Sequence, residues 1–274
     1  MGDQKLAIFK GKKIRKTIYN NEWWFVVEDV VLALIESRDP KQYIQRMKSR
    51  DHELKQGWVQ IVHTLKIETS GGKQDVICAN TEGIFRIIQS IPSPKAESFK
   101  LWLARVGYER IKEIEDPELA TKRTRLLYKA KGYSDAWIEK RMRGMAIREE
   151  LTDEWDKRGA KEQAEYTILT AEISKAAFGV TPSEYKELKG LERENLRDHM
   201  DELELIFNML GEKATTEIHK NENSQGLPKL KVDARAGGNI AGGARKQLEK
   251  KLGRSIVSKD NYLQEPESQK ILTK

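Results

Sequence analysis

Residues 22–35 read EWWFVVEDVVLALI, and this run changes from a strand pattern to a helical one within a few positions. The aromatic and β-branched residues from Trp23 to Val27 favour a β-strand. A short helix should follow from about Asp29 to Glu36. The run therefore predicts a strand that leads directly into a helix.

Further strands are predicted on both sides of this run. Residues 6–9 and 14–19 are β-prone, and the polar residues 20–22 predict a turn before the aromatic strand. Strands should recur at Trp58 to Glu68 and at Asp75 to Ala79. Between these two strands, Gly71 and Gly72 can take the positive φ of a hairpin turn. The sequence thus predicts a small antiparallel sheet.

Capping residues mark the helices of this first part. Asp39 followed by Pro40 is typical of an N-cap and a first helical residue, and predicts a helix from Pro40 to about Arg50. Another helix should begin after Asn80 or Thr81. Ser93 should cap a long helix opened by Pro94, whose apolar residues recur at three-to-four spacing and should pack on the sheet.

The chain becomes almost wholly helical beyond that point. Proline and glycine residues divide it into helices of ordinary length, and Thr181 with Glu184 has the spacing of a capping box. Near Gly226 the composition shifts. We therefore expect an α+β protein, with a small antiparallel sheet and helices in residues 1–112, a helical domain in residues 113–226, and a basic, glycine-containing segment in residues 227–274.

The composition indicates small cores and a large helical surface. Of the 274 residues, 38% are hydrophobic and 34% are charged, which lowers the expectation of a deep substrate pocket. The apolar runs are too short to cross a bilayer, and the first residues lack the apolar stretch of a secretion signal. A single cysteine, Cys78, agrees with a reducing compartment. These features predict a soluble, cytoplasmic protein without a membrane partner.

The basic charge is concentrated at the two ends of the sequence. Residues 1–110 carry a net charge of +6, residues 111–228 a net charge of −5, and residues 229–259 a net charge of +7. Such asymmetry is typical of proteins that bind polyanions, because each neutralised phosphate releases counterions and adds affinity. The alternative is a solvated surface with a disordered basic tail.

The sequence contains no recognisable catalytic or metal-binding motif. His52, His63, His199 and His219 are dispersed and lack the spacing of a helical zinc site. Cys78 lies in an apolar, β-prone stretch that favours a buried thiol over a nucleophile. The run GNIAGGARK at residues 238–246 lacks the lysine and hydroxyl of a phosphate loop; its glycines should break a helix or allow close backbone approach. We expect no cofactor, no metal and no enzymatic activity.

Basic residues grouped on short elements are the candidate site. They fall on the first hairpin, the helix after Asp39, the second hairpin and the C-terminal segment, and a helix or two-stranded ribbon of this size fits the major groove of DNA. The tryptophans at these positions are more typical of a core than of a base-stacking surface. The candidate DNA-binding residues are Lys10, Lys12, Lys13, Arg15, Lys16, Arg46, Lys48, Arg50, Lys66, Lys73, Arg245, Lys246, Lys250, Lys251 and Arg254.

Three blocks of the first part resemble a known domain. In order, they are EWWFVVEDV at residues 22–30, NTEGIF at residues 80–85, and SPKAESFKLWL at residues 93–103. They are similar to the BRO-type amino-terminal domain of phage antirepressors and their bacterial relatives. The resemblance covers about residues 4–110 and implies a sheet-and-helix domain implicated in DNA binding.

The remainder resembles the DNA-damage-inducible protein D family. That resemblance implies a bacterial or prophage DNA-associated protein of the damage response, without established catalytic residues. His199 lies in one of the matching motifs, although a helix-borne histidine between Asp198 and Asp201 favours a structural or surface role over a functional one. The matching stretches are residues 150–151 with Gly159, 166–168, 185–191, 195–200, 203–205, 237–238 and 244–246.

Three functions are compatible with these observations. The first is a DNA-binding accessory protein of the damage response that modulates recombination or transcription. The second is a phage or prophage antirepressor that acts through protein contacts, with a repressor or recombination protein as partner. The third is an unrecognised enzyme such as a nuclease, since carboxylates are abundant.

Overall fold

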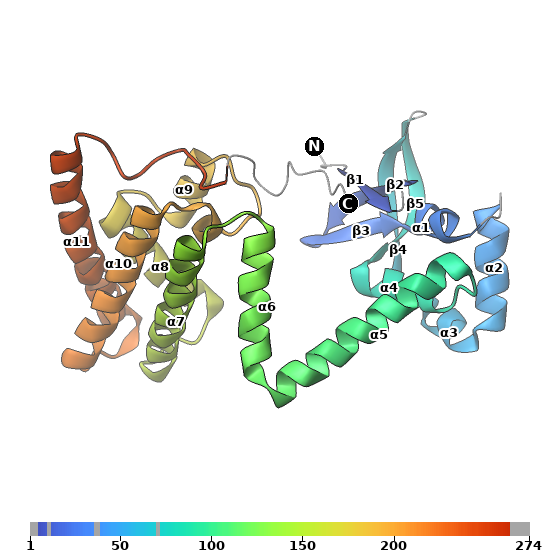
Figure 1. Ribbon diagram of the computed structural model, residues 1–274, viewed down its shortest axis with the longest axis horizontal. Helices are drawn as coiled ribbons and strands as arrows, with labels where there is room; N and C mark the ends of the chain where they lie inside the picture. The colour runs from blue at the N-terminus through green and yellow to red at the C-terminus, as the bar shows by residue number, and fades with distance from the viewer. Residues whose placement is uncertain (1–4, 10–11, 36–38, 70–71, 264–274) are drawn as a thin grey trace. The chain divides into compact units, whose positions relative to one another are not determined.

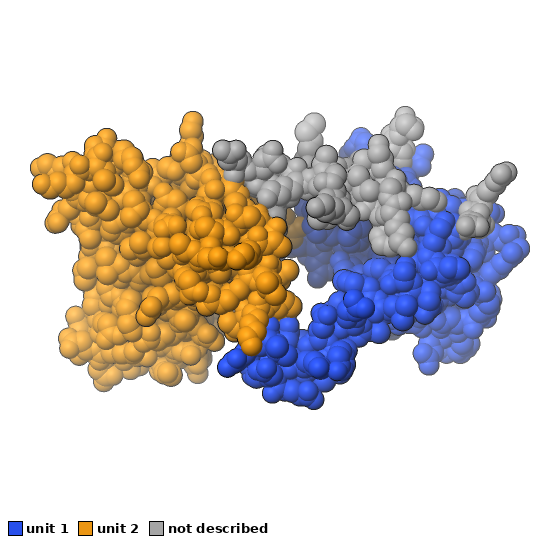
Figure 2. Space-filling view, viewed as in Figure 1, with its two compact units in different colours: residues 1–119, 274 blue, residues 120–273 orange. Residues whose placement is uncertain are grey.

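The computed structural model describes residues 5–9, 12–35, 39–69 and 72–263. The chain divides into two compact units, residues 1–119 and residues 120–273 (Figure 2). Among the described residues, no helix is both long and apolar enough to cross a membrane.

An antiparallel sheet of five strands forms the first unit, as expected for an α+β fold (Figure 1). The strands run in the spatial order β1-β2-β3-β5-β4. Between β2 and β3, Asn20 and Asn21 have φ angles of 48° and 62°, so the predicted polar turn is a two-residue hairpin loop with two left-handed residues. The strands are β1 (Lys5–Phe9), β2 (Lys12–Tyr19), β3 (Glu22–Val26), β4 (Val62–Thr69) and β5 (Gly72–Asn80).

The helices of this unit follow the strands with short connections. Their bounds are α1 (Val27–Leu34), α2 (Pro40–Arg50), α3 (His52–Ile61), α4 (Thr81–Gln89) and α5 (Pro94–Glu115). The expected strand from Trp58 to Glu68 was wrong over its first four residues, which belong to α3. Asp51 caps this helix, and Leu54 and Trp58 bury one helical face at i and i+4 spacing.

Both faces of the sheet carry buried residues. On one face, α1 to α5 cover a core that includes Val31, Met47 and Ile87. On the opposite face, Trp24, Val26, Ile67 and Cys78 form a smaller cluster. The prediction that the tryptophans are core residues is confirmed for Trp24 and Trp58, which are 6% and 8% exposed, but was wrong for Trp102, which is 49% exposed.

The second unit consists of helices. They are α6 (Pro117–Ala130), α7 (Asp135–Lys157), α8 (Gln163–Phe178), α9 (Pro182–Leu188), a 3-10 turn (Leu196–His199), α10 (Glu202–Asn221) and α11 (Gly226–Leu252). The predicted capping box at Thr181 and Glu184 is present at the start of α9.

Much of the basic, glycine-containing stretch is helical: α11 (Gly226–Leu252) lies in the second unit. The 27-residue α11 packs along α8 and α10. Its glycines lie within the helix and allow close packing: a Cβ at Gly237 would lie 2.5 Å from the backbone nitrogen of Thr215, and one at Gly238 would lie 2.6 Å from the Ile173 carbonyl. Of the two roles expected for these glycines, close approach is therefore the one observed.

Candidate nucleic-acid interface

Helix α2 concentrates positive charge more strongly than any other helix of the first unit. Its sequence, PKQYIQRMKSR, contains four basic residues and no acidic one. The Asp39 carboxylate caps its first turn by accepting a hydrogen bond from the Gln42 amide at 3.0 Å. Ile44 and Met47 are buried in the core and fix the rotation of the helix about its axis. The opposite face therefore points to solvent in one defined orientation.

The solvent face of α2 combines cationic and hydrogen-bonding side chains. Glutamine pairs with adenine edges and arginine with guanine edges, while lysine and arginine neutralise phosphates. Sequence analysis identified Arg46 and Arg50 but missed Lys41, Gln42, Gln45 and Ser49, although their i, i+3 and i+4 spacing on the same helical face could have revealed them. The exposed residues are Lys41, Gln42, Gln45, Arg46, Ser49 and Arg50.

Two cations of α2 lie over aromatic rings. The Lys48 ammonium is 4.8 Å from the centroid of the Trp58 ring, and the Arg50 guanidinium carbon is 5.9 Å from that of Tyr43. Such contacts attract a cation to the face of the ring and restrict its side chain. Lys48 is half-buried and supports the packing of α2 on α3, whereas Arg50 stays exposed.

The junction of α2 and α3 is held by Asp51. Its carboxylate accepts hydrogen bonds from Ser90 Oγ at 2.5 Å, from the Leu54 amide at 2.8 Å and from Arg86 Nη2 at 3.0 and 3.1 Å. The Ser90 and Leu54 hydrogen bonds, together with Arg86, lower the pKa of Asp51 to about 2. The network ties the end of α2 to α4.

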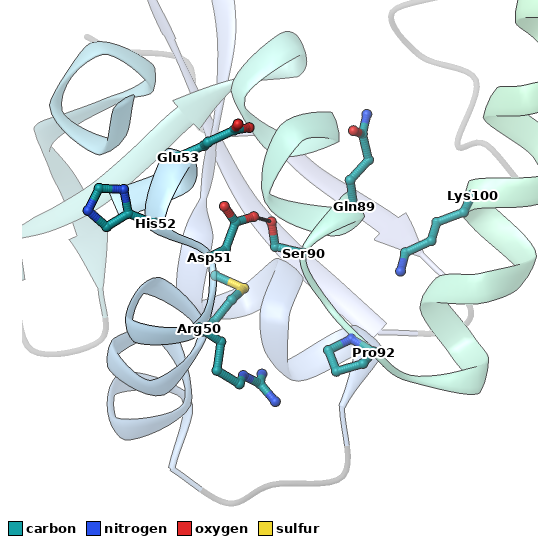
Figure 3. Close-up of a pocket in the computed structure, with 9 residues that line it drawn as sticks. Arg50, Asp51, His52, Glu53, Gln89, Ser90, Pro92 and Lys100 are labelled. Carbon is teal, nitrogen blue, oxygen red and sulfur yellow. Dashed lines mark hydrogen bonds between the residues drawn. The ribbon is translucent and has the colours of Figure 1, made fainter. Parts of the chain in front are cut away.

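A shallow, open hollow of about 490 Å³ lies beside this junction. Asp51 and Ser90 point toward one another at its centre, and Lys100 extends toward it from α5 (Figure 3). Its lining combines the basic residues Arg50 and Lys100 with the acidic residues Asp51 and Glu53, so the hollow is less positive than the exposed face of α2. The hollow is lined by Met47, Arg50, Asp51, His52, Glu53, Gln89, Ser90, Pro92 and Lys100.

The first hairpin offers less charge to a ligand than its sequence suggested. Arg15 donates hydrogen bonds to the Asp29 carboxylate from its amide, Nε and Nη2 at 2.9, 2.8 and 2.7 Å, and these bonds raise the pKa of Arg15. Lys16 lies 4.2 Å from the centroid of the Trp23 ring. Lys12 and Lys13 belong to β2, while Lys10 lies outside the described residues.

The second hairpin carries balanced charge. Lys66 and Lys73 are exposed, but the strand register places Lys66 opposite Asp75 and Lys73 opposite Glu68. Directly opposed side chains lie on the same face of the sheet, so each lysine has an acidic neighbour. This hairpin is therefore a weaker anion-binding surface than α2.

The C-terminal candidates separate into a buried and an exposed group. The Arg245 side chain is 8% exposed and donates hydrogen bonds from Nε to the Ala177 carbonyl at 2.8 Å and from Nη1 to Glu249 at 2.6 Å. Its guanidinium therefore ties α11 to α8 instead of facing a ligand. The other four, Lys246, Lys250, Lys251 and Arg254, are exposed near the end of α11.

A buried polar network in the helical unit contains a serine, a histidine and an aspartate. His219 Nδ1 and Ser224 Oγ both contact Asp233 Oδ2, and Trp155 Nε1 donates to His219 Nε2 at 3.1 Å. A neutral imidazole with its proton on Nδ1 satisfies both contacts. Because Nε2 already accepts from Trp155, this histidine is not placed to activate Ser224.

The Cys78 thiol and the His199 side chain are both buried, as is typical of structural residues. Burial raises the pKa of the Cys78 thiol to about 11, so it is a poor nucleophile at neutral pH. His199, whose role the sequence left open, is buried and its carbonyl accepts a hydrogen bond from the Tyr262 amide at 3.2 Å. Within the described ranges, no three histidine, cysteine, aspartate or glutamate side chains are grouped so as to hold a metal ion.

Comparison with known protein families finds a match within the first unit. Residues 13–109 match the family model of the BRO family, N-terminal domain. The match spans β2 through most of α5 and includes the whole of α2. No curated protein matches the chain.

Proposed function

We propose that the first unit binds DNA and that the exposed face of α2 is its principal contact surface. The observation that carries this proposal is the composition of α2: four basic residues, no acidic residue, and a solvent face made of lysine, arginine, glutamine and serine. The BRO match over residues 13–109 supports it, because this domain is found in phage and prophage proteins and is implicated in DNA binding.

The geometry of α2 suits insertion into a groove. An α-helix with its side chains is about 10–12 Å wide, close to the width of the major groove. Arg46 and Gln45 lie in the middle of the exposed face and are the candidates for contacts to base edges. Lys41 and Arg50, at the two ends of the helix, would contact phosphates, and Lys100 would extend that contact.

The anchoring of α2 supports a fixed docking orientation. Asp39 holds its start, Ile44 and Met47 hold its buried face, and Asp51 ties its end to α4. A helix held in this way loses little conformational freedom on binding, so more of the interaction energy appears as affinity.

At the level of the whole protein, the proposed role is that of a non-enzymatic, DNA-binding accessory protein of the bacterial or prophage damage response, which modulates recombination or transcription. The resemblance of residues 150–246 to the DNA-damage-inducible protein D family motivates the damage-response part. The alternative is an antirepressor that acts by binding a repressor protein. It predicts that the isolated chain has no measurable affinity for DNA.

A binding titration of the full chain tests the proposal. Labelled single- and double-stranded oligonucleotides would be titrated at two salt concentrations, and the fluorescence anisotropy recorded. We expect affinity to fall roughly tenfold or more between about 50 and 200 mM salt, since each phosphate contact releases counterions. Undetectable binding to both forms, or binding that does not respond to salt, would overturn the proposal and favour the antirepressor role.

A further inference from the structure

The C-terminal half of α5 exposes a row of apolar residues on one side. Leu101, Ala104, Tyr108 and Ile111 follow the alternating three-and-four spacing of a coiled-coil seam. Leu101, Tyr108 and Ile111 are 64%, 58% and 57% exposed, and Ala104 is also exposed. Within its unit, this part of α5 projects beyond the sheet and the other helices (Figure 1). We refer to these four residues as the α5 seam.

The α5 seam does not face the core of its own unit. Ala96 and Phe99 anchor the beginning of α5 in that core. With 3.6 residues per turn, the centre of the seam lies roughly 130° around the helix from these two residues. Trp102 is on the side nearer the core and contacts Phe85 and Phe99, which accounts for its partial burial. The seam is therefore a second, separate apolar stripe.

We propose that the α5 seam pairs with the same seam of a second copy of this chain, with the two helices antiparallel. In that arrangement, seam positions meet in layers centred near Val106. Leu101 meets the second copy's Ile111, and Ala104 meets the second copy's Tyr108. Leu101 and Ile111 have similar volumes, and the small Ala104 side chain leaves room for the large Tyr108 ring. The α5 seam is therefore complementary to itself in this register.

The charges beside the seam favour this antiparallel pairing. Lys100, Arg105 and Lys112 flank it, while Glu97 and Glu115 lie at its two ends. Antiparallel pairing brings Lys100 close to the second copy's Glu115, so each end holds two lysines and two glutamates. A parallel pairing would place Glu97 and Glu115 opposite their own counterparts and bring Lys100 beside the second copy's Arg105, which is unfavourable. In the antiparallel register the two Arg105 side chains also meet near the axis, but each has a Glu109 side chain within one helical turn.

The exposed area is sufficient for a specific contact between two copies. From the exposed fractions of the seam residues and the aliphatic parts of the flanking side chains, each copy offers on the order of 500 Å², or about 1,000 Å² for the pair, where specific interfaces begin. The pairing would leave the exposed face of α2 free and does not depend on DNA binding; of the residues assigned to the DNA contact, it involves Lys100, at the edge of that surface.

Cysteine cross-linking tests the register of the pairing. Gly107 lies next to the two-fold axis, and a Cβ at this position meets no atom within 4 Å. The variant Gly107→Cys should therefore form a disulfide-linked dimer under mild oxidation. In the matched control, Ser98→Cys, the two thiols would be separated by about 24 Å along the axis, from 16 residues of 1.5 Å rise. The native Cys78 is buried and does not interfere.

A charge reversal provides the second test. Near the axis, each Arg105 lies within one helical turn of the Glu109 side chains of both copies. Arg105→Glu would gather four carboxylates there and should convert the dimer of the full chain to a monomer in sedimentation analysis. Adding Glu109→Arg should restore the dimer. A wild-type chain that is monomeric at about 100 μM, equal cross-linking of the two cysteine variants, or failure of the double variant to recover would each overturn the proposal.

Discussion

Arg86 donates hydrogen bonds through Nη2 to both carboxylate oxygens of Asp51, at 3.1 and 3.0 Å. This contact joins α4 to the single residue that separates α2 from α3. Asp51 also caps the first turn of α3. The orientation of α2, the basic helix, therefore depends on the contact between Asp51 and Arg86 as well as on its own sequence. The position of the proposed DNA-contacting surface is thus determined by a residue that need not contact DNA.

Replacing Asp51 should destabilise the first unit. Asp51→Ala removes the cap of α3 and leaves Arg86 without its carboxylate partner, at a cost of about 1–2 kcal/mol in the free energy of unfolding. Asp51→Asn keeps a capping oxygen and should cost less. Urea unfolding followed by circular dichroism would measure both, and an Ala variant as stable as the wild type would contradict the structural role.

The lowered pKa of Asp51 also predicts the direction of a pH dependence. The folded pKa of about 2 lies below the ordinary value for aspartate, so protons bind more readily to the unfolded chain. The stabilising contribution is therefore present above about pH 4 and is lost as pH falls through about 2. In Asp51→Asn, stability should fall less steeply over this acidic range than in the wild type.

His219 predicts a pH dependence of the helical unit nearer to neutrality. Burial lowers the pKa of His219, although its hydrogen bond with Asp233 partly opposes the effect. The unfolded chain takes up a proton near pH 6.5, whereas the folded chain does so only at lower pH, so stability should decrease as pH falls below about 6.5.

The variant His219→Gln should flatten this slope between pH 7 and 5. It should also lower stability at pH 7, because Trp155 or Asp233 loses a buried partner. His52→Gln serves as the control, because the His52 side chain is exposed at the start of α3 and has no buried hydrogen-bond partner like Trp155 or Asp233 among the described contacts. Equal slopes for the wild type and His219→Gln would exclude His219 as the source of the dependence.

The glycines of α11 should differ sharply in their tolerance of alanine. Gly237→Ala places a Cβ against the Thr215 backbone and should cost about 1–3 kcal/mol or more through overpacking. Gly243 has open space around it, and Gly243→Ala should stabilise the helix by about 0.5–1 kcal/mol. Thermal unfolding of both variants measures the difference, and similar melting temperatures would contradict the packing of α11 against α10.

The buried pair Lys189 and Glu204 should be more sensitive to loss of one partner than to loss of both. Both side chains are fully buried, and Lys189 Nζ lies 3.0 Å from Glu204 Oε1. Lys189 Nζ also donates a hydrogen bond to the Asp260 carbonyl at 2.6 Å. Lys189→Met leaves the Glu204 charge uncompensated and should cost about 3–5 kcal/mol, whereas the double change with Glu204→Leu should recover part of that loss. The unfolding free energies of the wild type, both single variants and the double variant form the required cycle.

Helix starts were predicted correctly where a capping residue and the residues next to it determine them. Asp39 and Pro40 placed the start of α2, and Thr181 with Glu184 placed the start of α9. Trp58 was assigned to a strand because its β propensity is high, but the cap at Asp51 and burial at helical spacing prevailed. These two signals are local, so the sequence contained them; the contact that sequence could not show is the one between Asp51 and Arg86, 35 residues away.

The candidate site was predicted in part. Arg46 and Arg50 were identified from charge, and the structure places them on one exposed face. The same charge criterion also selected Arg15 and Arg245, whose guanidinium groups contact Asp29 and Glu249. Net charge does not distinguish a cation in an ion pair from one available to a ligand, since that difference depends on the fold.

The most direct test of the central claim compares two double variants in DNA binding at one moderate salt concentration. Arg46→Gln with Arg50→Gln removes two charges from the exposed face of α2, and Lys66→Gln with Lys73→Gln removes two from the β4–β5 hairpin. We predict a loss of affinity of about tenfold or more for the α2 variant, since a single bidentate contact between arginine and a base contributes roughly 1–3 kcal/mol, and less than about twofold for the hairpin variant. Equal losses in the two variants, with both folded, would contradict the assignment of α2 as the DNA-binding surface.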